Sequence, residues 1–223
     1  MNKSVYPNLF TGANLAFGAL SIAFSATGRF EEAATCVLLS LLADGCDGRV
    51  ARALGVSGPF GRELDSLADV IAFGLAPAFL LFSRELSAAG IIGYVPFLAM
   101  SVLGAFRLAR FNIKTDEIHG YFQGLPIPTA GCLVATYVLS GVMLPWELTG
   151  IFTVVVALLM VSEVHYPDFK GKGADPNHPA ALLVVAVLGA SLLYADLNVW
   201  PVLPFALYTV FGICNTAANG WRR

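Results

Sequence analysis

Charged side chains are scarce in this sequence. Asp, Glu, Lys and Arg make up 13% of its 223 residues, whereas an ordinary soluble domain contains about 25%. Hydrophobic residues make up 57%, and the mean hydropathy is +0.73. The formal net charge of −2 gives no sign of a nucleic-acid partner, and we expect none. This composition excludes an ordinary soluble domain and indicates a protein embedded in a lipid bilayer.

Closely spaced cysteines are also absent. Cys36, Cys46, Cys132 and Cys214 form no close pair, and they lie in or beside apolar segments. A zinc site or a disulfide framework would need cysteines at short, regular spacing. We therefore interpret the four thiols as small packing residues.

Long apolar runs fill most of the chain. A helix that crosses a bilayer needs about 20 mostly apolar residues. The sequence predicts eight such helices, at about residues 8–28, 31–49, 64–83, 89–110, 125–143, 147–164, 180–196 and 200–218. Because these segments leave no room for a separate soluble domain, we expect an all-α integral membrane protein with a single domain over residues 1–223.

The basic residues favour one orientation in the membrane, because Lys and Arg accumulate in the cytoplasmic loops of membrane proteins. With eight helices both termini lie on one side, and placing them in the cytoplasm leaves only Arg29 and Arg84 outside. The basic residues inside are then Lys3, Arg49, Arg52, Arg62, Arg107, Arg110, Lys114, Lys170, Lys172, Arg222 and Arg223. We therefore predict a multi-pass protein of the cytoplasmic membrane with both termini inside.

One stretch, LLADGCDGRVARALGVSGPFGRELDSLADVIAFG, gathers charge between two apolar helices. Asp44 and Asp47 are three residues apart at the cytoplasmic end of the second predicted helix. Asp65 and Asp69 are four residues apart at the start of the third. Both spacings place the two side chains on one face of a helix. The intervening ALGVSGPFG is typical of a turn, so two antiparallel helices would bring the four carboxylates together.

Several interpretations of these carboxylates stay open. Four of them at a membrane edge repel one another without cations, and oxygen ligands suit Mg²⁺ or Mn²⁺. Alternatively, they form a solvated turn or an ion-pair network, or they bind the ion carried by a cation or solute transporter. Gly48, Ala51 and Gly61 favour a bound ligand, because small residues let it approach the backbone closely. Arg52 adds a donor for a phosphate oxygen, which an ion path does not need.

The same stretch resembles the signature of the CDP-alcohol phosphotransferases. That signature is Asp, two residues, Asp-Gly, two residues, Ala-Arg, eight residues, Gly, three residues, Asp, three residues and Asp. The matching residues are Asp44, Asp47, Gly48, Ala51, Arg52, Gly61, Asp65 and Asp69, with every gap as the pattern requires. Members of this family transfer a phosphoalcohol group from a CDP-linked donor to an acceptor alcohol and release CMP. The resemblance therefore implies an enzyme with a core of six membrane helices, typically a homodimer.

The resemblance also implies roles for individual residues. Two divalent ions, Mg²⁺ or Mn²⁺, would be held by Asp44, Asp47, Asp65 and Asp69. Asp69 would also act as general base on the acceptor hydroxyl. The CDP-lipid pocket would be lined by Gly48, Ala51, Arg52, Ser57 and Gly61. Asn14, a polar residue inside the first apolar run, either joins this pocket or bonds to a neighbouring helix.

Further stretches are similar to the family members that use serine as the acceptor. They are TGANLAFG (11–18), RLARFNI (107–113), FQGLPIPTAG (122–131) and LMVSEVHYPDFK (159–170), and the similarity covers about residues 5–172. It implies that CDP-diacylglycerol and L-serine are the substrates, although glycerol 3-phosphate and inositol phosphate stay open as acceptors. Arg107 and Arg110 either bind the serine carboxylate or anchor their helix to membrane lipids. Asn112 either binds substrate or caps the helix.

Overall fold

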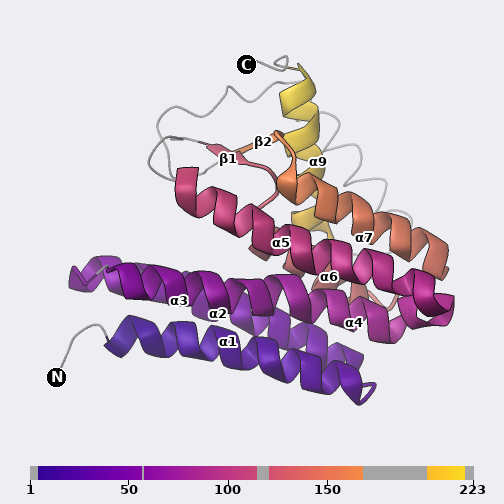
Figure 1. Ribbon diagram of the computed structural model, residues 1–223, viewed down its shortest axis with the longest axis horizontal. Coiled ribbons are helices and arrows are strands. Elements are labelled where there is room, and N and C mark those ends of the chain that lie inside the picture. The colour runs from indigo at the N-terminus through magenta and orange to yellow at the C-terminus, as the bar shows by residue number, and fades with distance from the viewer. Residues whose placement is uncertain (1–4, 57, 115–120, 168–199, 219–223) are drawn as a thin grey trace.

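Helices dominate the computed structural model, which describes residues 5–56, 58–114, 121–167 and 200–218 (Figure 1). The helices are α1 (Val5–Ala26), α2 (Phe30–Leu54), α3 (Pro59–Asp69), η1 (Val70–Leu75), α4 (Ala76–Arg84), η2 (Leu86–Gly93), α5 (Tyr94–Lys114), α6 (Ile127–Leu139), α7 (Trp146–Val161) and α9 (Leu203–Ala218). The strands are β1 (Tyr121–Gln123) and β2 (His165–Pro167). In Figure 1, α1, α2 and the continuous rod of α3, η1 and α4 lie side by side, with α5 and α6 packed over them and α7 packed on α5.

The all-α prediction is confirmed, but the count of eight membrane helices is not. Within the described ranges, three stretches are long and apolar enough to cross a membrane: Val5–Ala26, Pro59–Arg84 and Leu86–Ile113. The apolar helices α6, α7 and α9 contain only 13, 16 and 16 residues. α6 is shorter than its apolar run because Pro126 precedes it and Gly141, with φ of 72°, lies in the turn after it. The seventh predicted helix, residues 180–196, lies outside the described residues.

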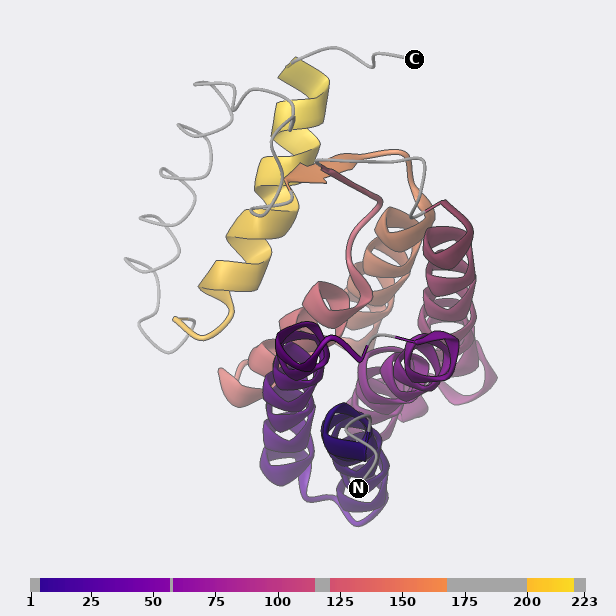
Figure 2. The same cartoon turned by 90° about the vertical axis from the view of Figure 1, so that its left-hand side faces the viewer.

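The predicted turn between the two acidic pairs is confirmed. α2 ends at Leu54 because Gly55 adopts the left-handed conformation, with φ of 63°, and its N–H bonds to carbonyls of the last helical turn. α3 then begins at Pro59, a position where the missing N–H of proline needs no partner. Figure 2 looks along these helices and shows α2 and α3 on either side of α1. The end of α2 and the starts of α1 and α3 therefore meet at one end of the protein.

A π-helical segment, η1, follows Asp69 and connects α3 to α4. Such segments contain an extra residue per turn and occur often at functional sites. Two glycines let other helices pack directly on its backbone. A Cβ atom at Gly18 of α1 would lie only 2.8 Å from Cα of Ala72, and one at Gly131 of α6 would lie 2.8 Å from Cα of Phe73. Real Cβ atoms do not approach other atoms this closely. Glycine at these two positions is therefore what allows α1 and α6 to approach η1.

A two-stranded antiparallel sheet, which the sequence analysis did not anticipate, joins the segments that precede α6 and follow α7. Phe122 of β1 pairs with Tyr166 of β2. α9 packs against β2 (Figure 2), where the Thr216 hydroxyl accepts a hydrogen bond from the main-chain N–H of His165 at 2.9 Å. The fully buried ring of Tyr166 lies directly against Gly212 of α9, where no side chain would fit. These contacts fasten α9 to the sheet.

At the α4 end of the rod, far from Asp65, a buried polar network holds the helices together. The carboxylate of Glu85 accepts hydrogen bonds from Tyr137 of α6 and Thr149 of α7, and it lies 3.4 Å from the Arg84 guanidinium. Arg84 also donates to the carbonyl of Val142 at 3.1 Å. Because these groups come from α4, α6, α7 and the loop between them, the network fixes this end of the structure independently of the acidic end.

Candidate active site at the ends of α2 and α3

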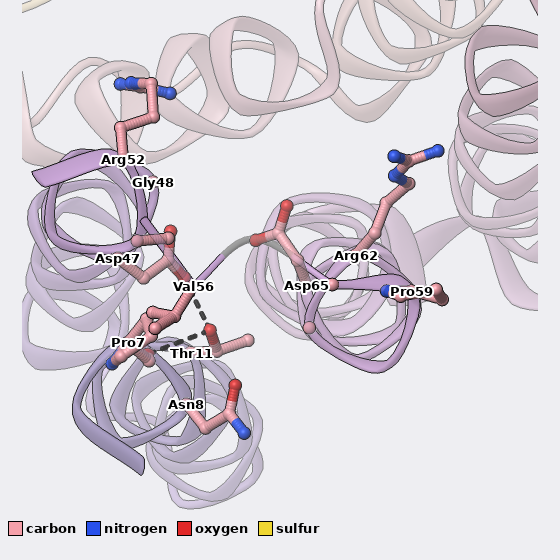
Figure 3. A pocket seen from close by; sticks show the side chains of 13 residues that line it. Pro7, Asn8, Thr11, Asp47, Gly48, Arg52, Val56, Pro59, Arg62 and Asp65 are labelled. Atoms are coloured by element: carbon pink, nitrogen blue, oxygen red, sulfur yellow. Dashed lines mark hydrogen bonds between the residues drawn. The ribbon is translucent and has the colours of Figure 1, made fainter. Parts of the chain in front are cut away.

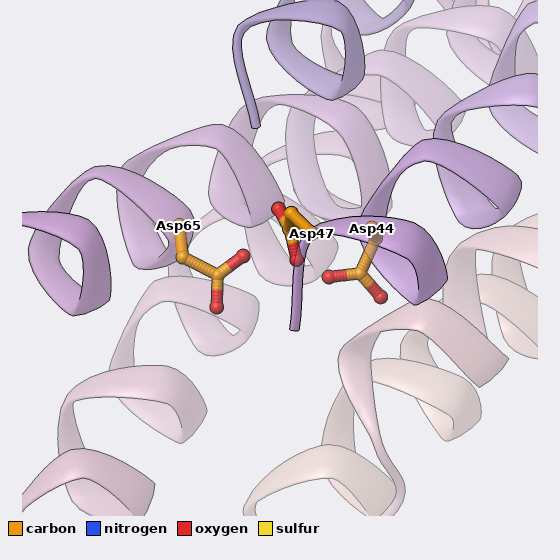
Figure 4. Close-up of side chains that lie close together, drawn as sticks. All are labelled: Asp44, Asp47 and Asp65. Atoms are coloured by element: carbon orange, nitrogen blue, oxygen red, sulfur yellow. The ribbon is translucent and has the colours of Figure 1, made fainter. Parts of the chain in front are cut away.

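Three carboxylates from two helices converge in the structure. Asp44 and Asp47 extend from α2 and Asp65 extends from α3 toward them (Figure 4). One carboxylate oxygen of each residue lies within 4.8 Å of the others. Oδ1 of Asp65 is buried and has no hydrogen-bond partner in the described part of the chain. We call these three residues the aspartate cluster. Acidic groups this close repel one another, so the arrangement suits a divalent cation that prefers oxygen ligands.

Helix α1 supports two acidic side chains, one from each helix. The Thr11 hydroxyl donates a hydrogen bond to Oδ2 of Asp47 at 2.7 Å. The Asn14 amide donates to Oδ1 of Asp69 at 3.0 Å. Asp69 lies one helical turn beyond Asp65, outside the aspartate cluster but close enough for the charge of Asp65 to act on it. The amide of Asn14 is therefore engaged with a neighbouring helix.

A cavity of about 520 Å³ opens beside the aspartate cluster (Figure 3). The starts of α1 and α3 and the end of α2 enclose it, and we call it the α1–α3 pocket. Its lining residues are Pro7, Asn8, Thr11, Asp47, Gly48, Ala51, Arg52, Val56, Gly58, Pro59, Gly61, Arg62 and Asp65. The structure thus brings four residues expected from the sequence, Gly48, Ala51, Arg52 and Gly61, to one cavity with two of the carboxylates. Ser57, also expected there, lies outside the described residues.

Both signature glycines lie beside a polar side chain at this pocket. A Cβ atom at Gly48 would lie 3.4 Å from Nη1 of Arg52, and one at Gly61 would lie 3.6 Å from Oδ1 of Asn8. The guanidinium groups of Arg52 and Arg62 extend from opposite walls in Figure 3. A pocket with cationic groups on its walls and carboxylates at its base suits an anionic ligand that also binds cations, such as a diphosphate.

From α1 the sequence offered only Asn14 as a pocket residue, whereas the structure places other residues of this helix in the lining of the pocket. Pro7, Asn8 and Thr11 line it, and Thr11 also bonds to Asp47, as the dashed line in Figure 3 shows. A signal was present, because Asn8, Thr11 and Asn14 recur every three residues in an otherwise apolar run. That spacing keeps the three polar side chains near one face of a helix.

The two arginines of α5 have different surroundings. Arg110 donates hydrogen bonds of 2.7 to 3.3 Å to the main-chain carbonyls of Gln123, Met160, Val161 and Ser162. It therefore fastens α5 to β1 and to the end of α7. Arg107 is only 4% exposed, and its Nε atom has no hydrogen-bond partner among the residues that the structure describes. The charges of Arg107 and Asp69 interact, which places this buried cation near the acidic end of α3.

Tyr208 of α9 connects Arg107 with a second buried polar group. It lies within electrostatic range of Arg107, and its ring stacks on that of Tyr166 with centroids 5.4 Å apart. Burial raises the pKa of the Tyr166 hydroxyl, so this group stays protonated and can donate. Within the described ranges the hydroxyl has no hydrogen-bond partner. Nε of Arg107 and the Tyr166 hydroxyl are thus two buried donors for which the described residues supply no acceptor.

Asn112, the third residue expected at the acceptor, forms a bond between helices. Its amide donates to the hydroxyl of Ser66 at 2.8 Å. Ser66 directly follows Asp65, so the bond ties α5 to the helix that carries one member of the aspartate cluster.

Comparison with known proteins agrees with this geometry. The sequence profile of the CDP-alcohol phosphatidyltransferase family matches residues 4–166, which contain the aspartate cluster, the α1–α3 pocket and both arginines of α5. The chain belongs to this family. The match confirms the resemblance found in the sequence. Membership in the CDP-alcohol phosphatidyltransferase family, together with three long apolar helices, indicates a membrane protein.

Several members of the CDP-alcohol phosphatidyltransferase family are similar to this chain over most of its length. A CDP-diacylglycerol–serine O-phosphatidyltransferase of Helicobacter pylori is 37% identical over 217 residues, which cover 94% of this chain and 90% of the relative. An archaetidylserine synthase of Methanothermobacter thermautotrophicus is 38% identical over 176 residues, or 76% of this chain and 72% of the relative. A CDP-diacylglycerol–serine O-phosphatidyltransferase of Bacillus subtilis is 36% identical over 170 residues, or 76% and 93%.

We expect Asp65→Asn to weaken the binding of Mn²⁺ by at least about tenfold, because even supporting groups around a metal contribute on the order of 10- to 100-fold. The measurement is a Mn²⁺ titration of the purified protein followed by electron paramagnetic resonance. The matched control is Glu63→Gln, which removes one negative charge from an exposed position on the same helix. Equal Mn²⁺ affinities for the two variants would contradict a metal site at the aspartate cluster.

Proposed function

We propose that this chain transfers the phosphatidyl group of CDP-diacylglycerol to the hydroxyl of L-serine and releases CMP. The observation that carries the proposal is the convergence of Asp44, Asp47 and Asp65 beside a pocket with arginines on its walls. The names of the relatives from Helicobacter pylori and Bacillus subtilis support the same reaction. The products would be phosphatidylserine and CMP.

In this proposal the α1–α3 pocket binds the CDP part of the donor. Arg52 and Arg62 extend into the region where phosphate oxygens would lie, and each offers several N–H donors in a fixed plane. Gly48 and Gly61 line the pocket, and their lack of a side chain would let the ligand approach the backbone closely. The cavity of about 520 Å³ has the size of typical small-molecule sites, which measure roughly 300–1,000 Å³.

The aspartate cluster would hold Mg²⁺ or Mn²⁺, with Asp69 completing the site of a second ion. Bound divalent ions would neutralise the diphosphate and stabilise the leaving CMP. The protein's part is to keep the carboxylates close together, which Thr11 does for Asp47 and the Gly55–Pro59 turn does for Asp65. The oxygen-only ligand set and the buried, unpartnered Oδ1 of Asp65 within the described chain support this assignment.

Asp69 is the proposed general base. It would take the proton from the serine hydroxyl as that oxygen attacks the β-phosphorus of the donor. The new bond joins the serine oxygen to this phosphorus, and the bond that breaks joins the phosphorus to the oxygen bridging to CMP. A serine hydroxyl is a weak nucleophile at neutral pH, so a base held next to it is needed.

Arg107 is the residue that we assign to the serine carboxylate. It is buried near Asp69, and its Nε lacks a hydrogen-bond partner in the described chain. Arg110 is already engaged with four carbonyls, so its role in acceptor binding stays a prediction. A serine held by Arg107 would present its hydroxyl on the side of Asp69.

The site's position fits a donor that is part lipid and part nucleotide. Acyl chains stay in the bilayer, whereas serine and the cytidine group come from water, so helix ends at a membrane surface serve both. The distribution of Lys and Arg favours the cytoplasmic surface of the cell membrane for this end and for both termini. The homodimer that the family resemblance implies stays a prediction.

We expect purified protein supplied with CDP-diacylglycerol and Mg²⁺ or Mn²⁺ to release CMP when L-serine is added, because serine supplies both the hydroxyl and the carboxylate. A chelator should abolish the release. Glycerol 3-phosphate and inositol phosphate are the comparison acceptors. CMP release with either of them but not with serine would show that serine is not the acceptor. Ion flux into liposomes without any CMP release would favour a transporter instead.

We expect Arg107→Gln to raise the KM for serine by roughly 10- to 150-fold, because a hydrogen bond to a charged group contributes about 1.5 to 3 kcal/mol. The KM for CDP-diacylglycerol should change by less than about threefold. Arg49→Gln is the matched control, since it removes an exposed positive charge from the same end of the protein. The assignment of Arg107 fails if both variants bind serine as the unaltered protein does.

A further inference from the structure

Asn14 is a buried polar residue of α1 that contacts one of the acidic residues. It is fully buried, and its Nδ2 donates to Oδ1 of Asp69, itself only 7% exposed, at 3.0 Å. The two residues are 55 positions apart in the chain. Asn14 is not among the residues that line the α1–α3 pocket. Its hydrogen bond to the acidic groups therefore runs to Asp69, outside the α1–α3 pocket.

The position of Asn14 is fixed from two sides. Ser40 of α2 donates a hydrogen bond to the main-chain carbonyl of Asn14 at 3.1 Å. One turn further along α1, Gly18 lies against the backbone of Ala72 in η1, where a Cβ atom would approach Cα of Ala72 to 2.8 Å. Because η1 directly follows Asp69, this contact holds α1 at the depth where the Asn14 amide reaches the carboxylate.

A neutral amide has a particular effect on a carboxylate in an acidic site. It donates one hydrogen bond, so it fixes the rotation of the carboxylate without adding a charge. An arginine or lysine in its place would pair with Asp69 and compete with bound cations. With Oδ1 of Asp69 held by Asn14, Oδ2 would be the oxygen that faces the reacting groups. The bond would thus select which oxygen receives the proton and where that oxygen lies.

We propose that Asn14 is a positioning residue for Asp69, and this inference rests on the proposed function of Asp69 as general base. Asn14 touches neither substrate. It acts by holding one carboxylate oxygen so that the other is aligned with the acceptor hydroxyl. A role in binding the CDP-lipid is the alternative. Steady-state kinetics distinguish the two roles, because positioning of Asp69 affects kcat whereas binding of the CDP-lipid affects its KM.

The test is Asn14→Leu, which has a similar volume but no donor. We expect kcat for serine-dependent CMP release to fall by about 10- to 100-fold, the range typical of residues that orient a reacting group. The KM for CDP-diacylglycerol should stay within about twofold, because the α1–α3 pocket is intact. Asn14→Ala is the second variant, and the thermal midpoints of both in detergent show whether the fold is retained.

Ser21→Ala is the matched control. Ser21 is also fully buried on α1, two turns beyond Asn14, and its hydroxyl has no hydrogen-bond partner in the part of the chain that the structure covers. This variant should keep the kcat and KM of the unaltered protein. A loss of kcat equal to that of Asn14→Leu would show that packing of α1, and not the bond to Asp69, is what matters.

Other results would overturn the proposal in recognisable ways. An unchanged kcat in Asn14→Leu would show that the bond does not align Asp69. A raised KM for CDP-diacylglycerol with unchanged kcat would show that Asn14 binds the nucleotide. If the unaltered protein releases CMP only with another acceptor, the serine assignment fails, and the same comparison of variants is made with that acceptor. If it releases CMP with no acceptor, both proposals are wrong.

Discussion

Repulsion among the carboxylates of Asp44, Asp47 and Asp65 is the constraint on which the rest of this structure depends. Three acidic oxygens within 4.8 Å of one another are stable only if a cation lies between them or if protons replace it. The fold keeps them together nonetheless, with a glycine-terminated helix on one side and a proline-started helix on the other. An arrangement that keeps like charges together beside the α1–α3 pocket favours the binding of cations there. Bound cations in turn favour an anionic ligand in the pocket.

Helix α1 unites the scaffold with this site. It contacts α2, α3 and η1, and along one face it carries Thr11, Asn14 and Gly18. The first two residues hold carboxylates of α2 and α3, and the third packs against the π-helical segment. The opposite end of the rod is held separately by the buried network around Glu85. Thus one end of the bundle is fixed by an ion pair and hydrogen bonds within the protein, while the other is arranged to be completed by ligands.

Much of the site, but less of the fold, follows from the sequence. The spacings of the aspartates and the Gly55–Pro59 turn obey local rules of helix periodicity and capping, so they predict which side chains meet. The bonds from Asn14 to Asp69 and from Arg110 to the end of α7 join residues 50 or more positions apart, and no local pattern specifies such pairs. Hydropathy also overestimates helix length where a proline or a left-handed glycine interrupts an apolar run, as it does around α6.

The central claim is that the aspartate cluster binds divalent cations beside a nucleotide pocket. Anomalous diffraction from crystals grown with Mn²⁺ and CDP tests it most directly. The account predicts an anomalous peak between the carboxylates of Asp44, Asp47 and Asp65, with CDP in the α1–α3 pocket and its phosphates facing that peak. Manganese bound elsewhere, with the three carboxylates turned to solvent and CDP absent from the pocket, would contradict it.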